Sequence, residues 1–325
     1  MQTTESPATA VGAPVTETCL DCGAPLGRGA FECFDTRFGH TGLYAIAKCS
    51  SCALEQTLPR PDAAQLKALY ENFYNFGGEK DTRYTKVREH FLLSPWYRLW
   101  LALDGDISFH AVVGSGRLLD VGCNEGRGLK LYQKSGFQAE GLEFNENAAA
   151  VARSSGFKVY TDPLSAFFPA MLYDRIVLSN VLEHSLKPSA MLQDLHRLLA
   201  DGGQLWISCP NSASWLRRLF GRFWINWHVP FHIVHFSSAT LTQDVRQAGF
   251  DILDVRTETP SLWVTQSILA RLYAKPGQPT RELRSVLNVL PILLAVRCLL
   301  FPLLWLGNRL GRGDCLVVVA RKRLK

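Results

Sequence analysis

The sequence predicts an α/β protein built on a doubly wound, mostly parallel sheet. Between residues 113 and 260, short apolar strand patterns alternate with segments of helical spacing, which is typical of parallel sheets with helices on both faces. Two cysteine pairs near the N-terminus indicate a small β-rich module ahead of that sheet. A long apolar run near the C-terminus, followed by one more strand-like segment, indicates a helical insertion before the last strand.

These patterns divide the chain into segments with different compositions. The first is rich in Thr, Ala, Pro and Ser, which is typical of a disordered tail, and Pro59-Arg-Pro61 marks the end of the second. In chain order, the expected segments are a disordered tail (1–17), a cysteine-containing β module (18–60), a helical cap or linker (61–112), the α/β domain (113–260), an apolar helical insertion (261–313), and the last strand with a basic tail (314–325).

Composition excludes several classes of protein. With 325 residues, of which 47% are hydrophobic and 20% charged, the chain has enough apolar material for about two globular domains. The net charge of +6 is too small for a histone-like or ribosomal arm. The first residues show no basic stretch followed by an apolar one, so we expect no signal peptide and a cytoplasmic protein.

The cysteine pairs have the spacing of a metal site. Cys19 and Cys22 form one Cys-x-x-Cys pair and Cys49 and Cys52 form another, with 26 residues between them. Four thiolates arranged as a tetrahedron favour a closed structural zinc site rather than a catalytic one. A zinc ribbon can also bind RNA, but this module has no basic stripe with interleaved aromatic residues, so we do not expect nucleic acid as a partner.

The loop after the first strand of the α/β domain has the features of a ligand-binding turn. The segment from Asp120 to Gly128 joins a strand to a helix, whose first N–H groups are free to bind a ligand. Gly122 allows close approach of the backbone, and Asn124 tolerates a left-handed conformation. The next strand ends at Glu143, a carboxylate that can accept both hydroxyls of a ribose.

Together with later motifs, this loop resembles the class I S-adenosylmethionine-dependent methyltransferases. The resemblance covers about residues 115 to 257 and includes a glycine at most positions where the family has one, with Asn124 as the departure. It depends on Leu118-Leu-Asp-Val-Gly122, Gly141-Leu-Glu143, Tyr173 through Asn180 to His184, Asp201-Gly-Gly203, Pro230-Phe-His232 and Ala248-Gly-Phe250.

The resemblance implies a Rossmann-like sheet of seven strands and assigns roles to particular residues. Asp120 and Gly122, with Asn124 and Gly126 in the same loop, would hold the methionine part of S-adenosylmethionine. The remaining cofactor positions follow the later strands: Glu143 at the ribose, Asp162 beside the adenine, and Asn180 next to the methyl group.

Two histidines are candidates for the base that an acceptor hydroxyl requires. His184 follows the strand that would line the cofactor, and His232 lies in the loop that the family places over the substrate. A purely structural role, in which such a histidine bonds the next turn, stays open at both positions. The acceptor that we expect is a small molecule, namely a hydroxyl of a sugar or cell-surface glycan precursor. The alternatives are an RNA methyltransferase guided by the zinc module and a non-catalytic scaffold with a methyltransferase fold.

The segment 286–306 is apolar enough to contact a membrane. Its length could span a bilayer, but a strand that must rejoin the sheet follows it. Basic residues flank it on both sides, which suits a segment lying on the inner face of an anionic membrane. Internal packing or dimerisation is the other interpretation, and the sequence leaves the oligomeric state open.

Overall fold

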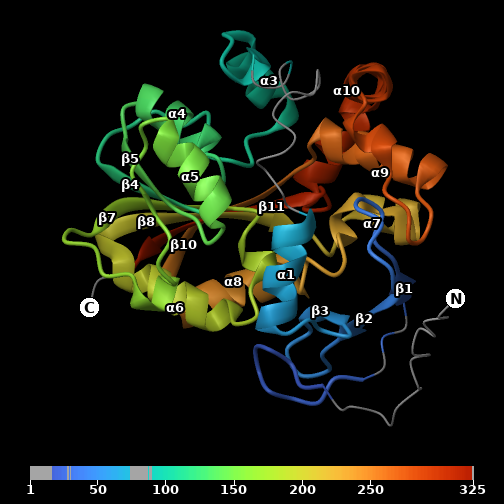
Figure 1. Ribbon diagram of the computed structural model, residues 1–325, viewed down its shortest axis with the longest axis horizontal. Helices are drawn as coiled ribbons and strands as arrows, with labels where there is room; N and C mark the ends of the chain where they lie inside the picture. The colour runs from blue at the N-terminus through green and yellow to red at the C-terminus, as the bar shows by residue number, and fades with distance from the viewer. Residues whose placement is uncertain (1–16, 28, 30, 74–86, 88–89, 324–325) are drawn as a thin grey trace, which may run out of the picture.

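The structure is a computed structural model that describes residues 17–73, 87 and 90–323, apart from residues 28 and 30 (Figure 1). Nearly all of the expected disordered tail therefore lies outside the described residues. The first described residue, Glu17, forms an ion pair of 3.7 Å with Arg60.

A seven-stranded sheet forms the centre of the molecule, as the resemblance implied. Its strand order is β10-β11-β8-β7-β4-β5-β6. Strands β4 to β8 are parallel to one another, while β11 lies antiparallel between β8 and β10, so the last strand does return to the sheet. The strands are β4 (Arg117–Val121), β5 (Gln138–Leu142), β6 (Val159–Tyr160), β7 (Tyr173–Ser179), β8 (Leu199–Pro210), β10 (Phe250–Glu258) and β11 (Cys315–Lys322).

Helices cover both faces of this sheet because successive strand residues point to opposite sides. Leu118 and Val177 pack with residues of α4 (Arg127–Lys134) and α5 (Glu146–Ser154). Their neighbours in the strands pack with residues of α6 (Pro188–Leu198) and α8 (Ser238–Gln247) instead. Figure 1 shows α4 and α5 above the sheet and α6 and α8 below it. This doubly wound arrangement confirms the predicted fold class.

The cysteine-containing segment forms a second, antiparallel sheet that includes a strand from far along the chain. The order is β1-β2-β3-β9, with β1 (Phe31–Cys33), β2 (Tyr44–Lys48), β3 (Glu55–Leu58) and β9 (Val234–His235). Beyond the ladder, the Thr57 amide donates to the Ile233 carbonyl at 3.0 Å and the Thr57 hydroxyl donates to the His232 carbonyl at 2.6 Å. The N-terminal module and the segment around His232 are therefore one hydrogen-bonded unit.

Five more helices in the described part of the chain lie outside these two layers. They are α1 (Ala63–Phe73), α3 (Trp96–Asp104), α7 (Trp215–Phe220), α9 (Ser261–Tyr273) and α10 (Val286–Arg309). Short 3₁₀ turns are η1 (Leu164–Ala166), η2 (Leu182–His184), η3 (Gly221–Phe223), η4 (Ile225–Trp227) and η5 (Arg281–Arg284).

The apolar run near the C-terminus is one helix, α10, that lies on the surface with much of its apolar side uncovered. Leu287 is 81% exposed and Leu299 is 78% exposed. Val296 and Arg297 are buried, and Arg297 forms an ion pair of 3.0 Å with the buried carboxylate of Asp104. By length and composition alone α10 could cross a membrane, yet it leads directly into β11 in the sheet.

Candidate functional site

The loop between β4 and α4 has a backbone that only certain residues can adopt. Gly122, Asn124 and Gly126 all have positive φ, at 75°, 55° and 79°. Asparagine is one of the few residues that enter this left-handed region without large strain, so Asn124 replaces a glycine at little cost. A Cβ atom at Gly122 would lie 2.7 Å from the Val181 side chain, so glycine is required there. The departure from the family pattern at position 124 thus leaves the loop intact.

Glu143, which follows β5, holds this loop in place. One of its carboxylate oxygens accepts the Asn124 amide at 2.9 Å and the other accepts the Asn145 amide at 2.8 Å. Burial raises the pKa of this carboxyl. Each oxygen still has a lone pair, so the same carboxylate can also accept donors from a ligand. The sequence pointed to Glu143 as a ligand contact, but not to its bonds with the loop.

The other expected cofactor residues lie at the carboxyl ends of neighbouring parallel strands. Asp120 is the last residue but one of β4 and pairs with Gly141 of β5, and burial followed by the Glu143 charge raises its pKa to about 8. Asn180 follows β7 with a φ of 55°, and its side-chain oxygen is buried without a hydrogen-bond partner within the described residues. Asp162 is exposed beyond the end of β6, at the edge of the sheet.

Both candidate histidines lie in one cluster beyond β7. The ring centroids of His184 and His232 are 4.6 Å apart. Each ring donates its Nδ1 proton to a backbone carbonyl, His184 to Phe231 at 2.9 Å and His232 to Asn226 at 2.8 Å. Burial lowers the pKa of His184 to about 4 and that of His232 well below its usual value, so both rings are neutral.

Sequence reasoning did not include Glu183 among the site residues, although it precedes His184 directly. Its side chain is 1% exposed, and neither carboxylate oxygen has a hydrogen-bond partner in the described chain. One oxygen lies 3.9 Å from Nε2 of His232. Burial raises the pKa of Glu183 to about 8. Only the fold brings residues 183 and 232 together, since the Ile233 amide donates to the Glu183 carbonyl at 2.8 Å.

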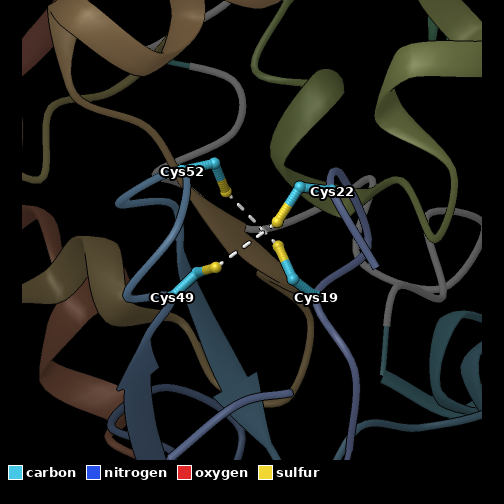
Figure 2. Close-up of side chains that lie close together, drawn as sticks. All are labelled: Cys19, Cys22, Cys49 and Cys52. Carbon is cyan, nitrogen blue, oxygen red and sulfur yellow. Dashed lines mark hydrogen bonds between the residues drawn. The ribbon is translucent and has the colours of Figure 1, made fainter. Parts of the chain in front are cut away.

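The four paired cysteines converge on one point, as Figure 2 shows. The sulfurs of Cys19 and Cys52 are 3.5 Å apart, as are those of Cys22 and Cys49, and all four lie within 4.8 Å of one another. The residue after each pair, Gly23 or Ala53, has a positive φ that turns the chain back. The side-chain amide of Gln56, which the sequence did not single out, donates to the Cys19 sulfur at 3.0 Å. This donor set suits a tetrahedral ion of the zinc type.

Comparisons with known proteins agree with this geometry. Residues 101–255 match the family model of a methyltransferase domain. A probable S-adenosylmethionine-dependent methyltransferase of Mycolicibacterium smegmatis is 28% identical over 141 residues, which are 42% of this chain and 52% of that protein. A ubiquinone biosynthesis O-methyltransferase of Pseudomonas aeruginosa is 24% identical over 154 residues, 43% of this chain and 66% of that protein. The matches thus span about half to two thirds of these relatives.

Among solved structures, the [4+2]-cyclase SpnF superimposes with a TM-score of 0.50 at 16% sequence identity, over 82% of this chain and 98% of that one. A likeness at this identity concerns the fold alone. The family match over residues 101–255, the strand order and the loop around Gly122 agree with one another, and together they support a class I S-adenosylmethionine-dependent methyltransferase domain in this part of the chain.

Proposed function

We propose that this protein transfers a methyl group from S-adenosylmethionine to a hydroxyl of a small molecule. The observation that carries the proposal is a juxtaposition: the Asp120–Gly126 loop, Glu143 and the histidine cluster all follow the carboxyl ends of adjacent parallel strands. Ligands of open parallel sheets bind at this edge. The relative named as an O-methyltransferase supports an oxygen acceptor.

The residues at this edge fit the cofactor. The loop has a left-handed backbone at Gly122, Asn124 and Gly126, and the Glu143 oxygens have spare lone pairs for ribose hydroxyls. The unpartnered buried oxygen of Asn180 suits a donor or the electropositive methyl group of the ligand. We assign Asp162, at the open edge, to the adenine. When bound, the cofactor supplies an activated methyl group; the chain must orient the acceptor and exclude water.

Replacing Glu143 by alanine should weaken cofactor binding roughly 10- to 100-fold, since charge-assisted hydrogen bonds are worth about 1.5–3 kcal/mol. Calorimetric titration with S-adenosylmethionine measures this. Glu146→Ala, which removes an exposed carboxylate on α5, is the matched control and should bind normally. Unchanged affinity of Glu143→Ala would contradict the cofactor assignment. If the wild type also fails to bind, the protein is the non-catalytic scaffold.

His232 and His184 are the residues that we propose to accept the acceptor's proton. Because each ring donates its Nδ1 proton to a carbonyl, each Nε2 carries a lone pair. His184 is the more accessible of the two, while His232 is 5% exposed. The hydroxyl oxygen would form the new bond to the methyl carbon while the bond from that carbon to the sulfonium sulfur breaks, the thioether S-adenosylhomocysteine leaves, and the hydroxyl proton passes to Nε2.

The variants His232→Ala and His184→Ala should therefore lose turnover while they keep cofactor affinity. Loss of a general base lowers the rate about 10²- to 10⁴-fold. A methyl-transfer assay with labelled cofactor, combined with calorimetry, separates rate from binding. His90→Ala removes an exposed imidazole and serves as the control. Full activity in both variants would exclude a role for the cluster, and loss in only one would assign the base to that residue.

The acceptor that we propose is a sugar hydroxyl, carried by a nucleotide or a lipid. The support is the layout, in which a cysteine module precedes the methyltransferase domain as in some sugar methyltransferases. RNA is the runner-up acceptor; it would bind with a steep dependence on salt, because phosphate contacts release counterions. Product identification after incubation with candidate acceptors distinguishes the two.

We also propose that Cys19, Cys22, Cys49 and Cys52 hold one structural zinc ion. The Cys22→Ser variant should lose one equivalent of zinc and melt at a lower temperature, because metal binding stabilises the folded state. Elemental analysis and thermal melting test this, and Cys298→Ser, at an exposed cysteine outside the cluster, is the control. Retention of all metal by Cys22→Ser would contradict the site.

We also propose that the enzyme is cytoplasmic and contacts the inner face of a membrane through helix α10. Large apolar side chains are exposed along it, and Arg281, Arg284, Arg309 and Arg312 flank it at both ends. The burial of Arg297 against Asp104 anchors the other side of the helix to the protein. Monotopic attachment, with both ends of α10 on one side, suits this arrangement.

Binding to anionic vesicles should consequently be measurable by flotation and should weaken in high salt, since basic residues near a surface are screened. Replacing Leu287, Leu299 and Leu303 together by serine should abolish it. Replacing Phe168 and Met171, which are exposed outside α10, should not. Absence of flotation at low salt would favour a dimer interface. Protease access to residue 312 from the opposite side would indicate a true span.

A further inference from the structure

The histidine cluster contains three hydrogen-bond acceptors that face one another. The Glu183 carboxylate has no donor among the described residues, and its nearer oxygen lies 3.9 Å from Nε2 of His232. One ligand atom from each of Glu183, His184 and His232 lies within 4.8 Å of the other two. The positive charge of Arg37 contributes to the lowered pKa of His184. Its guanidinium donates to the Ile225 carbonyl and makes no hydrogen bond to Glu183.

The protonation of the rings follows from their outer contacts. A backbone carbonyl can only accept, so the contacts of Nδ1 with Phe231 and Asn226 fix the protons of His184 and His232 on Nδ1. In the neutral rings, Nε2 is then a pure acceptor. Two ring lone pairs and a carboxyl group that has no hydrogen-bond partner among the described residues therefore share one buried space, and a cation that joins them would offset the cost of burying these groups unpaired.

We propose that Glu183, His184 and His232 bind one divalent transition-metal ion. Two imidazoles and a carboxylate are a common ligand set for such ions and leave coordination positions open. A carbonyl that accepts the second ring proton is the usual outer contact of a metal-bound histidine, and both rings have one. The low exposure of the ligands also agrees with an ion held by these side chains in place of solvent, since Glu183 is 1% and His232 is 5% exposed.

This site differs in chemistry from the cysteine site. Nitrogen and oxygen ligands hold the ion here, whereas four thiolates do so in the N-terminal module. The inference concerns the imidazoles that the proposed function uses, and a lone pair bound to a metal cannot accept a proton at the same time. Metal content therefore decides how the cluster acts, while cofactor binding at Glu143 tests the proposed function independently.

The experiment counts metal in the full chain. Protein equilibrated with Zn²⁺ and then dialysed should contain two ions per chain, of which Glu183→Gln and His232→Asn each lose one. His90→Asn removes an exposed imidazole and should keep both. Reconstitution with Co²⁺ adds a spectroscopic readout: Glu183→Gln should keep the thiolate-to-cobalt charge-transfer band of the cysteine site but lose the weaker bands of a nitrogen and oxygen site.

One ion per chain in the wild type, removed by Cys22→Ser, would overturn the proposal, as would two ions in Glu183→Gln. Folding of the variants is checked by thermal melting without added metal. There Glu183→Gln should melt no lower than the wild type, because it removes a buried, unpartnered carboxylate. Should a variant fail to fold, Zn²⁺ titrated into wild type that already holds one ion must still fill one further site; absence of that binding refutes the inference.

Discussion

The pairing of Thr57 with the segment around His232 is the contact on which the rest of the site depends. The segment 225–236 consists of short turns and a two-residue strand, so it pairs only some of its backbone groups internally. The Thr57 amide and hydroxyl bond two of its carbonyls, and the Glu183 carbonyl accepts its Ile233 amide. The segment is thus held between β3 of the cysteine module and η2 of the methyltransferase domain. The cysteine module and the histidine segment are therefore joined by hydrogen bonds.

Features that depend on residues close together in the chain could be predicted from the sequence, whereas features that depend on contacts between distant residues could not. The sheet, the loop around Asn124 and the cysteine pairs could be predicted because strand patterns, turn residues and Cys-x-x-Cys spacing are local signals. Strand β9 could not, since two residues carry no period and gain their partner 175 or more positions away. The same holds for the Asp104–Arg297 ion pair and for the convergence of Glu183 with His232. In each case, the position of the side chain or strand is fixed by a contact between segments that are far apart in the chain. A single sequence has no local pattern that predicts such a contact.

Helix α10 has the apolar composition of a membrane span but is packed against the protein through a buried ion pair. An apolar run of this length satisfies the requirements of a membrane span, yet Arg297 in its middle is buried against Asp104, which also accepts the amide and hydroxyl of Ser261 in α9. Leaving either charge unpaired in the interior would cost about 3–5 kcal/mol. The helix is therefore fixed to the protein on one side by a polar contact and presents leucines on the other. A helix attached in this way can enter the surface of a bilayer but cannot cross it without breaking that pair.

The fold by itself does not determine the reaction, and the superposition on a protein named as a [4+2]-cyclase makes this concrete. What distinguishes one chemistry from another on this sheet is the set of groups beyond the strand ends. In the proposed function, Glu143 and the left-handed loop bind the cofactor, whose methyl group needs no further activation. The proposed hydroxyl acceptor does need activation, and among the described residues Glu183, His184 and His232 form a cluster of acceptor groups soon after Asn180 in the chain. The Nε2 lone pairs of the two histidines favour a substrate group that donates a hydrogen bond, or a cation to which such a group can bind. A hydroxyl meets both conditions, because it can give its proton to Nε2 or bind through oxygen to a cation.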